Sequence, residues 1–203
     1  RLVFVEESGR QFFTLLNEPL ESPFNQMVKR LFDLFLSIPT LLLILPPCMI
    51  LVKIFQILQA PGPLFFKQDR VGISGKHFTI WKFRSMTFDR EGTRDESIQA
   101  HPQDARIFSF GKIMRRFSID EFPQFINVLK GDMSIVGPRP EVPKYVNLYN
   151  ENQLEVLSVK PGITDHASIQ FFNESEILAK TKSPEQTYIN EILPEKLRLN
   201  LDY

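Results

Sequence analysis

The stretch LFLSIPTLLLILPPCMILV, from Leu34 to Val52, contains no charged residue over nineteen positions. As a helix it would be about 28 Å long, close to the roughly 30 Å hydrocarbon core of a bilayer. Pro39, Pro46 and Pro47 lie inside it, and each proline removes a backbone donor. We therefore expect the helix to break at Pro46 and Pro47 and to return to the same face of the membrane as a re-entrant segment. A spanning helix and a buried core helix of a soluble protein remain alternatives.

Basic residues flank this stretch on both sides, with Lys29 and Arg30 before it and a longer series after it: Lys53, Lys67, Arg70, Lys76, Lys82 and Arg84. A single-pass protein usually concentrates Lys and Arg on the cytoplasmic side of the membrane. The two-sided distribution therefore favours a segment whose ends share one leaflet, where they meet anionic headgroups of membrane lipids. Asp33 shares a helix face with Lys29 and Arg30, so we expect a local ion pair at the interface.

The chain has 203 residues, with 24 basic and 24 acidic side chains and a formal net charge of zero. This balance argues against a nucleic-acid partner, which would require a basic excess. The single cysteine, Cys48, excludes an intramolecular disulfide framework. Because the chain begins at Arg1 and residues 199–203 look like the middle of a segment, we expect a piece of a longer protein with a truncated C-terminus.

The remaining chain predicts an α+β fold that is mostly helical and contains a short β-hairpin. Residues 64–70 and 76–86 are predicted to form two strands around a turn that contains Gly72 and Gly75. Apolar residues recur at helical spacing over 119–130, so an amphipathic helix is expected there, ended by Gly131. The other expected elements are helices over 106–116, 141–157 and 183–193 and an extended segment over 163–172.

The segment RRFSIDEFPQ, residues 115–124, places two adjacent carboxylates, Asp120 and Glu121, at the start of the amphipathic helix. A helix N-terminus keeps a carboxylate ionised and attracts phosphate. An ionised aspartate is a competent nucleophile, and a glutamate is a hard oxygen ligand suited to Mg²⁺. The alternative is purely structural, because Ser118 and Glu121 also have the spacing of a capping box.

Four basic residues are candidates for binding substrate or phosphate. Arg115 immediately precedes the acidic pair, and Arg139 lies between two prolines in GPRP, which stiffen the chain around it. The alternative for Arg139 is a rigid turn with a solvated side chain. Lys82 and Arg84 share one face of the second predicted strand.

The order of these motifs resembles the bacterial sugar transferase family, the monotopic phosphoglycosyl transferases. The resemblance runs from about Met27 to Thr164 through KRLFDLFLS, PGPLFFKQDRVG, FTIWKFRSM, RRFSIDEFPQFINVLKGDMSIVGPRP and VKPGIT. It implies residues 1–26 as a linker or the tail of an upstream region, 27–60 as the re-entrant membrane helix and 61–203 as a catalytic domain. That domain would lie on the cytoplasmic face of the bacterial inner membrane.

The resemblance also implies a reaction. Asp120 would attack the β-phosphate of a UDP-sugar and release UMP, with Glu121 holding Mg²⁺ and Arg115 and Arg139 near the phosphates. The phosphosugar would then pass from the aspartate to polyprenyl (undecaprenyl) phosphate, which initiates synthesis of a surface glycan such as an exopolysaccharide or lipopolysaccharide. The competing hypotheses are a non-catalytic membrane-surface module with the same anchor and a single-pass protein with a structural soluble part.

Two positions depart from the family pattern. A Ser-Pro pair usually marks the helix break, whereas this chain has Leu45-Pro46 followed by Pro47. After PGIT, residues 165–170 read DHASIQ where many members have Gly-Trp-Ala-Gln, and we expect this segment to touch the sugar or the nucleotide. The sugar and the oligomeric state, a homodimer included, stay open.

Overall fold

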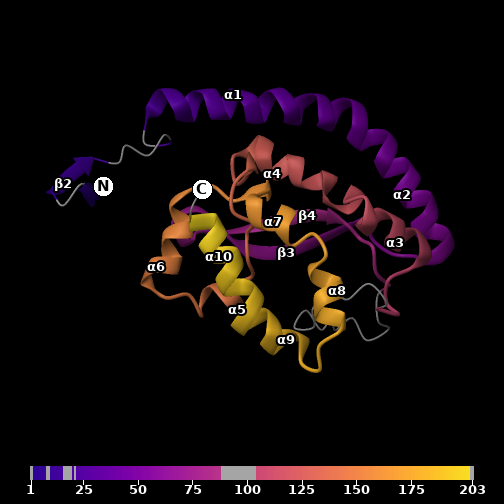
Figure 1. Cartoon of the computed structure of the whole chain (residues 1–203). Coiled ribbons are helices and arrows are strands. Elements are labelled where there is room, and N and C mark those ends of the chain that lie inside the picture. The colour runs from indigo at the N-terminus through magenta and orange to yellow at the C-terminus, as the bar shows by residue number, and fades with distance from the viewer. Residues whose placement is uncertain (1, 8–9, 16–19, 21, 88–103, 202–203) are drawn as a thin grey trace.

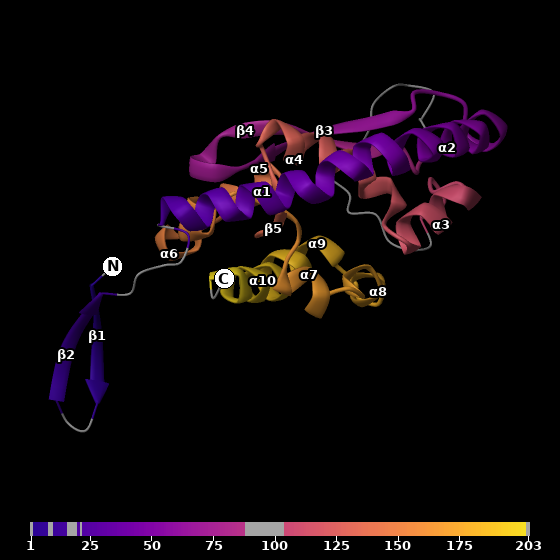
Figure 2. The ribbon, with the colours of Figure 1, turned by 90° about the horizontal axis from the view of Figure 1, so that it is seen from above.

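The computed structural model describes residues 2–7, 10–15, 20, 22–87 and 104–201. A long helical segment runs over a body of short helices and two-stranded sheets, as the two views in Figures 1 and 2 show. In chain order the elements are β1 (Leu2–Glu7), β2 (Arg10–Leu15), α1 (Pro23–Pro39), η2 (Thr40–Ile44), α2 (Leu45–Gln59), β3 (Phe65–Val71), η3 (Ile73–Gly75), β4 (His77–Phe83), α3 (Ser109–Arg116), η4 (Ile119–Gln124), α4 (Phe125–Lys130), β5 (Ser134–Val136), α5 (Pro143–Val146), α6 (Glu151–Leu154), η5 (Glu155–Ser158), β6 (Gly162–Thr164), α7 (His166–Gln170), α8 (Glu174–Ala179), α9 (Pro184–Thr187), η6 (Tyr188–Ile192) and α10 (Leu193–Leu201). The predicted mixture of helices and short strands is confirmed.

The apolar stretch lies inside one helical segment of 37 residues, Pro23–Gln59. Its two parts, α1 and α2, meet at η2, which is π-helical: the N–H of Leu45 donates to the carbonyl of Thr40. Figure 1 shows α2 turning away from the direction of α1 at this point. The expected break at Pro46 and Pro47 is therefore replaced by a bend in a continuous helix.

The prolines explain where the bend lies. Pro46 and Pro47 occupy the first positions of α2, directly after the π-helical turn. A proline at a helix start loses little, because the first N–H groups of a helix have no intrahelical partner. The wider turn of η2 lets the chain enter α2 with both prolines at such positions. The distortion therefore precedes the proline pair, and the helix bends without opening into a loop.

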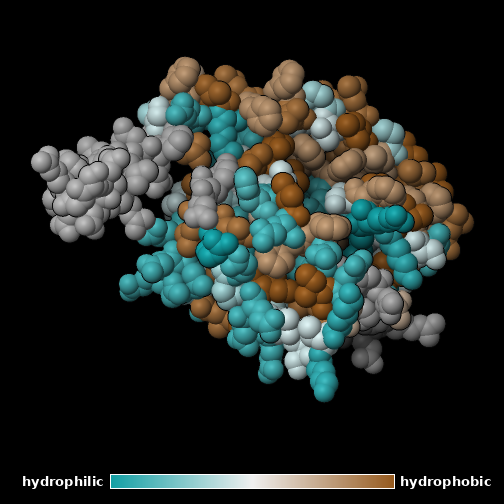
Figure 3. Space-filling view, viewed as in Figure 1, coloured by the Kyte–Doolittle hydropathy of each residue, from teal (hydrophilic) through white to brown (hydrophobic). Residues whose placement is uncertain are grey.

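The helical segment has an apolar outer side and a polar inner side. Only 17% of its most apolar window is buried, which argues against the buried core helix of a soluble protein. Large apolar residues are exposed along its length, among them Phe24, Leu31, Phe35, Leu42, Leu43, Ile50 and Leu58. They form the hydrophobic surface at the top and right of Figure 3. Three polar side chains, Asp33, Ser37 and Gln56, are instead buried against the body.

Asp33 turns inward, which corrects the expected ion pair at the membrane interface. Its side chain is 3% exposed, and Oδ1 accepts hydrogen bonds from Ser134 Oγ at 3.0 Å and from the backbone N–H of Ile135 at 2.9 Å. Lys29 donates to the carbonyl of Val136 at 2.7 Å. Arg30 donates to the carbonyls of Val128 and Leu129, near the end of α4. Helix α1 is thus attached to β5 and α4 by directed polar contacts.

The end of the helical segment is attached to the same body. Gln56 is fully buried, and its amide donates to the carbonyls of Leu64 at 3.1 Å and Arg84 at 2.8 Å. The apolar residues Leu45, Val52 and Ala60 join Phe83 and Met114 in one hydrophobic cluster. Both halves of the bent helix therefore rest on the body.

The predicted hairpin is confirmed: β3 and β4 pair antiparallel, with Lys67 opposite Trp81 and Phe66 opposite Lys82. Helix α4 is tied to β4 by the buried side chain of Asn127. Its amide donates to the carbonyl of Thr79 at 2.8 Å, and its Oδ1 accepts from the N–H of Trp81 at 3.2 Å. This contact fixes the chain around Asp120 and Glu121 relative to Lys82.

The predicted helices are present, but their lengths differ. The helix expected over 119–130 is the 3-10 segment η4 followed by α4, and it contains Pro123, which lacks a backbone donor. Gly131 ends it with a φ of 91°, as predicted. The helix expected over 141–157 divides into α5, α6 and η5, whereas the last helix continues beyond 193 to Leu201.

The segment expected to be extended over 163–172 is extended only at its start. Strand β6 pairs in parallel with β5 and ends at Thr164. Asp165 then caps α7 by accepting a hydrogen bond from the N–H of Ser168, so the chain becomes helical. The backbones of Gly162 and Gly137 also approach each other closely. A Cβ at Gly162 would lie 2.2 Å from the backbone nitrogen of Gly137.

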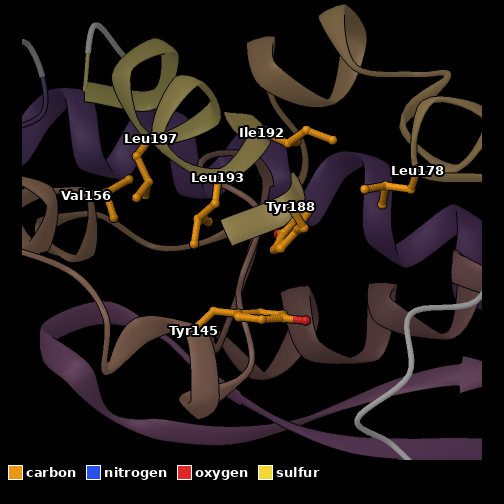
Figure 4. Close-up of a cluster of buried hydrophobic side chains, with 7 residues drawn as sticks. All are labelled: Tyr145, Val156, Leu178, Tyr188, Ile192, Leu193 and Leu197. Carbon is orange, nitrogen blue, oxygen red and sulfur yellow. The ribbon is translucent and has the colours of Figure 1, made fainter. Parts of the chain in front are cut away.

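The C-terminal helices cover the body with a hydrophobic cluster of their own. Figure 4 shows its side chains, which come from α5, η5, α8, η6 and α10: Tyr145, Val156, Leu178, Tyr188, Ile192, Leu193 and Leu197. The rings of Tyr145 and Tyr188 lie 4.9 Å apart.

At the other end of the chain, β1 and β2 form an antiparallel hairpin within the region expected to be a linker, and both views show it apart from the body.

We expect Asp33→Ala to lower the free energy of unfolding by about 1–3 kcal/mol, because it leaves the Ile135 N–H and the Ser134 hydroxyl buried without an acceptor. Urea unfolding in detergent measures the change. The matched control is Asp69→Ala, which removes an exposed pair with His77 and should cost no more than about 1 kcal/mol. Equal losses in the two variants would contradict the anchoring role of Asp33.

Candidate active site

The acidic pair lies directly after a sharp change of direction. Helix α3 ends at Arg116, and Ser118 then adopts a left-handed conformation with a φ of 54° before η4 begins. Ser118 makes no side-chain capping bond, so the capping box considered from the sequence does not form. The carboxylate of Glu121 is directed to other partners, so capping does not explain this residue.

Glu121 is held by two cations from different parts of the chain. Lys82, on β4, lies 2.7 Å from Glu121 Oε1. Arg139, after β5, forms a forked contact, with Nη2 2.5 Å from Oε1 and Nη1 3.3 Å from Oε2. The structure therefore brings together three of the predicted site residues that are far apart in the sequence.

Glu121 stays ionised because of these contacts. Burial alone would raise its pKa, but the charges and hydrogen bonds of Arg139 and Lys82 outweigh burial and hold the pKa well below its usual value. Glu121 in turn raises the pKa of Arg139. Burial lowers the pKa of Lys82, and the charge of Glu121 opposes that shift.

Asp120 has a different environment from its neighbour. Its side chain is 9% exposed, and no described residue donates a hydrogen bond to its carboxylate. Burial raises its pKa, while Lys82, Arg115 and Arg139 oppose that shift. Desolvation of the carboxylate outweighs these favourable charges and opposes the effect expected of a helix N-terminus. The lone pairs of Asp120 are left free, and a raised pKa makes a carboxylate more basic.

A large open cavity of about 1060 Å³ is lined by Glu121, whereas Asp120, the residue before it, is not among the lining residues. Glu121, Arg139 and Arg115 line it together with Arg116 and the apolar rings of Phe122 and Phe125. Its size suits a nucleotide-sized ligand, since ligand pockets commonly measure a few hundred to about 1,000 Å³. The arginines give this end the chemistry expected for phosphate binding.

Arg84, also predicted to bind phosphate, lies elsewhere and has a structural environment. It is 1% exposed, and its guanidinium donates to the carbonyls of Ala60, Pro63 and Met86 at 2.5–2.8 Å. Strand β4 ends at Phe83, so strand alternation gives no information on the contacts of Arg84, which follows it. Its position under the end of α2 corrects the predicted role.

The cavity is also lined by residues that were not among the predicted site residues: Arg70, Glu141, Glu174, Tyr188 and Lys196. They come from β3, the loop after GPRP, α8, η6 and α10, and no single local pattern joins these positions. Arg70 lay within the motif PGPLFFKQDRVG and Glu141 directly after GPRP, but neither motif gave a signal for a role in the site. Ser168, from the segment 165–170 that was expected to touch the sugar or the nucleotide, also lines the cavity.

The described residues offer no group of three or more His, Cys, Asp or Glu side chains that could enclose a metal ion. Mg²⁺ does not require one, because it usually keeps several waters and binds one or two carboxylates together with substrate phosphates. The adjacent carboxylates of Asp120 and Glu121 fit that requirement. Lys82 and Arg139 would then share Glu121 with the metal.

Comparison with known proteins identifies this arrangement. The family model described as bacterial sugar transferase matches residues 24–202, which contain the helical segment, the acidic pair and the cavity. The chain belongs to the bacterial sugar transferase family. It is therefore an enzyme of the sugar transferase class, as the resemblance predicted.

Individual relatives agree with this family assignment. The chain is 46% identical over 147 residues to the uncharacterized sugar transferase EpsL of Bacillus subtilis, covering 70% of this chain and 68% of the relative. It is 39% identical over 180 residues to the UDP-glucose:undecaprenyl-phosphate glucose-1-phosphate transferase of Escherichia coli, covering 86% of this chain and 38% of the relative. It is 37% identical over 157 residues to the UDP-N-acetylgalactosamine-undecaprenyl-phosphate N-acetylgalactosaminephosphotransferase of Aeromonas hydrophila, covering 76% and 36%. The chain thus spans little more than a third of the length of the last two, whose names specify different sugars.

We expect the carboxyl group of Asp120 to titrate above 3.8, its usual pKa, because burial disfavours the charged form. Arg115→Gln should raise this pKa further, since the charge of Arg115 opposes the shift. The carboxyl ¹³C chemical shift of Asp120, followed against pH, measures both values.

The neighbouring substitution Arg116→Gln is the control, because Arg116 is not among the groups that act on Asp120. Equal shifts in the two variants would contradict the specific role of Arg115. A wild-type pKa at or below 3.8 would contradict the effect of burial.

Proposed function

We propose that this chain transfers a sugar-1-phosphate from a UDP-sugar to polyprenyl phosphate, undecaprenyl phosphate in bacteria, as the initiating step of surface glycan synthesis. The carrying observation is the pairing of a buried, hydrogen-bond-free carboxylate, Asp120, with Glu121, which two cations hold, at the edge of an arginine-lined cavity. The names of the relatives support this class of donor and acceptor.

The first half-reaction uses Asp120 as the nucleophile. An oxygen of its carboxylate attacks the β-phosphorus of the UDP-sugar, and a carboxylate–phosphorus bond forms. The bond from the β-phosphorus to the bridging oxygen breaks, and its electron pair leaves with UMP. Arg139 and Arg115 bind the phosphate oxygens and stabilise the charge that develops on them.

The second half-reaction regenerates the enzyme. A phosphate oxygen of polyprenyl phosphate attacks the phosphorus of the aspartyl-phosphosugar. A new diphosphate bond forms, the bond to Asp120 breaks, and the free carboxylate returns. Asp120 therefore alternates between a nucleophile and a leaving group, and no water is consumed.

We also propose Mg²⁺ as the metal of this site, held by Glu121 and, in the free enzyme, by Asp120. When bound, Mg²⁺ neutralises charge on the diphosphate. Lys82 keeps the Glu121 carboxylate oriented towards the cavity, and Arg139 is positioned to transfer part of its contact from Glu121 to phosphate.

The placement on the cytoplasmic face of the inner membrane is part of the same proposal. A 37-residue helix would be about 55 Å long if straight, which is long enough to span a bilayer. However, its start is attached through Asp33 to β5, and its end is attached through Gln56 to the β3–β4 hairpin. Two ends attached to one body support a monotopic, re-entrant arrangement in which the apolar outer side enters one leaflet.

We expect Asp120→Asn to lower the rate of UMP release from UDP-sugars by about a thousandfold or more, because an amide cannot form the covalent intermediate. The assay contains detergent, polyprenyl phosphate, Mg²⁺ and a panel of UDP-sugars. The control is Asp132→Asn, which changes a carboxylate that has a weak contact with Asn127.

Repeated release of UMP by the wild type should require the lipid phosphate. It should also require the metal, so EDTA should stop it. A variant Asp120→Asn that releases UMP at nearly the wild-type rate would refute the nucleophile assignment. If the wild-type chain releases no UMP from any donor, the hypothesis of a non-catalytic membrane module is favoured.

The topology is tested by cysteine labelling in a Cys48→Ser background. Single cysteines at Asn25 and Pro61 mark the two ends of the helical segment, and one at Phe172, which is 85% exposed, marks the body. We expect a membrane-impermeant maleimide to label all three in inverted vesicles and none in intact spheroplasts. Labelling of the two ends from opposite sides would establish a spanning helix instead.

A further inference from the structure

A line of apolar side chains connects the long helical segment to the cavity. It begins on α2, where Ile54 and Leu58 are exposed. It continues on α3, which lies beside α2 in Figures 1 and 2. The ring of Phe110 on α3 stacks on the ring of Phe55 on α2, with 4.0 Å between their centroids. The N–H of Phe110 also donates to Gln59 Oε1 at 2.9 Å, so α3 is fixed against the end of α2.

Helix α3 carries this line away from α2. Phe110, Ile113 and Phe117 recur at positions i, i+3 and i+7, which places them on one face of the helix. These three residues form the α3 stripe. Phe110 packs against the hydrophobic cluster under α2, whereas Ile113 and Phe117 are exposed. Because seven residues of helix rise about 10 Å, the stripe leads well beyond the contact with α2.

The α3 stripe ends at the cavity. Arg116 and Ser118, the residues on either side of Phe117, both line the cavity. The guanidinium of Arg116 lies 5.8 Å from the centre of the Phe117 ring, so a cation adjoins the end of the stripe. Inside the cavity the apolar lining continues with Phe122 and Phe125, whose rings lie 6.5 Å apart.

Phe122 connects the cavity to the helical segment by a second route. It lines the cavity and also packs against the hydrophobic cluster that contains Leu45 and Val52 of α2. The apolar part of the cavity lining is therefore contiguous with the packing under α2. Contiguous exposed apolar surface of this kind is typical of sites that bind apolar ligands or membranes.

We propose that the α3 stripe, together with Phe122 and Phe125, binds the isoprenoid chain of the lipid phosphate acceptor. The acceptor joins a phosphate to a long apolar chain, and the structure places arginines beside an apolar path. The phosphate lies at the arginines of the cavity, and the chain leaves along α3 towards the exposed apolar residues of α2. This inference rests on the proposed function and adds where the acceptor chain binds.

A simpler role for the α3 stripe is contact with the bilayer alone. Such a contact would strengthen membrane binding but would not sense which acceptor occupies the cavity. A path for the acceptor chain instead makes affinity depend on how far that chain reaches along α3. The length of the acceptor chain therefore distinguishes the two roles.

The test compares geranyl, farnesyl and geranylgeranyl phosphate, which differ by one isoprene unit each, as acceptors for the chain in phosphatidylcholine nanodiscs. Phe117→Ser and Ile113→Ser replace exposed side chains, so the packing of the core stays in place. We expect both variants to raise KM for geranylgeranyl phosphate by about three- to tenfold and to change KM for geranyl phosphate least. Partition of each acceptor into the nanodisc is the same for every variant, so the comparison between variants isolates the contact with the protein.

Phe24→Ser is the matched control. Phe24 is 66% exposed and Phe117 is 65% exposed, but Phe24 lies at the start of α1, far along the helical segment from α3. Phe24→Ser should leave the dependence of KM on chain length unchanged. The proposal is overturned if both α3 variants keep the wild-type dependence, if they raise KM equally for all three acceptors, or if Phe24→Ser changes the dependence as much as they do.

A binding measurement separates this inference from the proposed function. By titration calorimetry without a UDP-sugar, the full chain in nanodiscs is titrated with geranylgeranyl phosphate and with inorganic phosphate, and empty nanodiscs give the background. We expect the lipid phosphate to bind more tightly, and Phe117→Ser to remove most of that gain. If the chain turns over no donor but the gain is present and is lost in the variant, the proposed function fails and the path for the chain stands. A lipid phosphate that binds no better than inorganic phosphate refutes the path whatever the outcome of the turnover assay.

Discussion

The buried carboxylate of Asp33 connects the long apolar helix to the residues of the candidate active site. It accepts hydrogen bonds from the N–H of Ile135 and the hydroxyl of Ser134, and Lys29 donates to the carbonyl of Val136. Helix α1 therefore contacts all three residues of β5. Gly137, Pro138 and Arg139 follow directly. Because two prolines stiffen that segment, the position of the Arg139 guanidinium is set within a few residues of the anchor. The position of Arg139 in the candidate site is thereby linked to the packing of a single helix.

The division of labour between the two acidic residues follows from their environments. Glu121 is in contact with Lys82 and Arg139, and these cations hold its pKa below its usual value. Asp120, one residue earlier, is buried without a donor, and its pKa is raised. Adjacent carboxylates with opposite shifts are typical of sites where one group holds position or charge and the other reacts. The left-handed conformation of Ser118 contributes to these different environments, because it turns the chain into η4. Neither carboxylate then takes part in capping the helix.

Sequence analysis predicted the features that depend on local pattern. The apolar helix, the β3–β4 hairpin, the glycine end of α4 and the grouping of Asp120, Glu121, Arg115 and Arg139 all follow from short motifs or from their joint resemblance to a family. Local pattern failed where the deciding contact is distant. Asp33 has the spacing of a surface ion pair, but its partners lie about a hundred residues away in β5. The helix over 166–170 was missed because its capping by Asp165 competes with the extended pattern that begins in β6. Residues such as Arg70 and Lys196 could not be grouped at all, because only the packing of α10 brings them to one cavity.

Arg84 shows how the architecture affects the reading of mutational data. Its guanidinium joins three carbonyls at the junction between the end of α2 and the loop after β4, and neither lysine nor glutamine can reproduce that set of donors. A screen that scores product formation would therefore rank Arg84 with the residues that contact substrate, and an alignment of active members would retain it. Such a ranking would reflect the seating of the helix on the body. Assays of abundance and activity, compared position by position, would distinguish the residues that build this junction from those that take part in the chemistry.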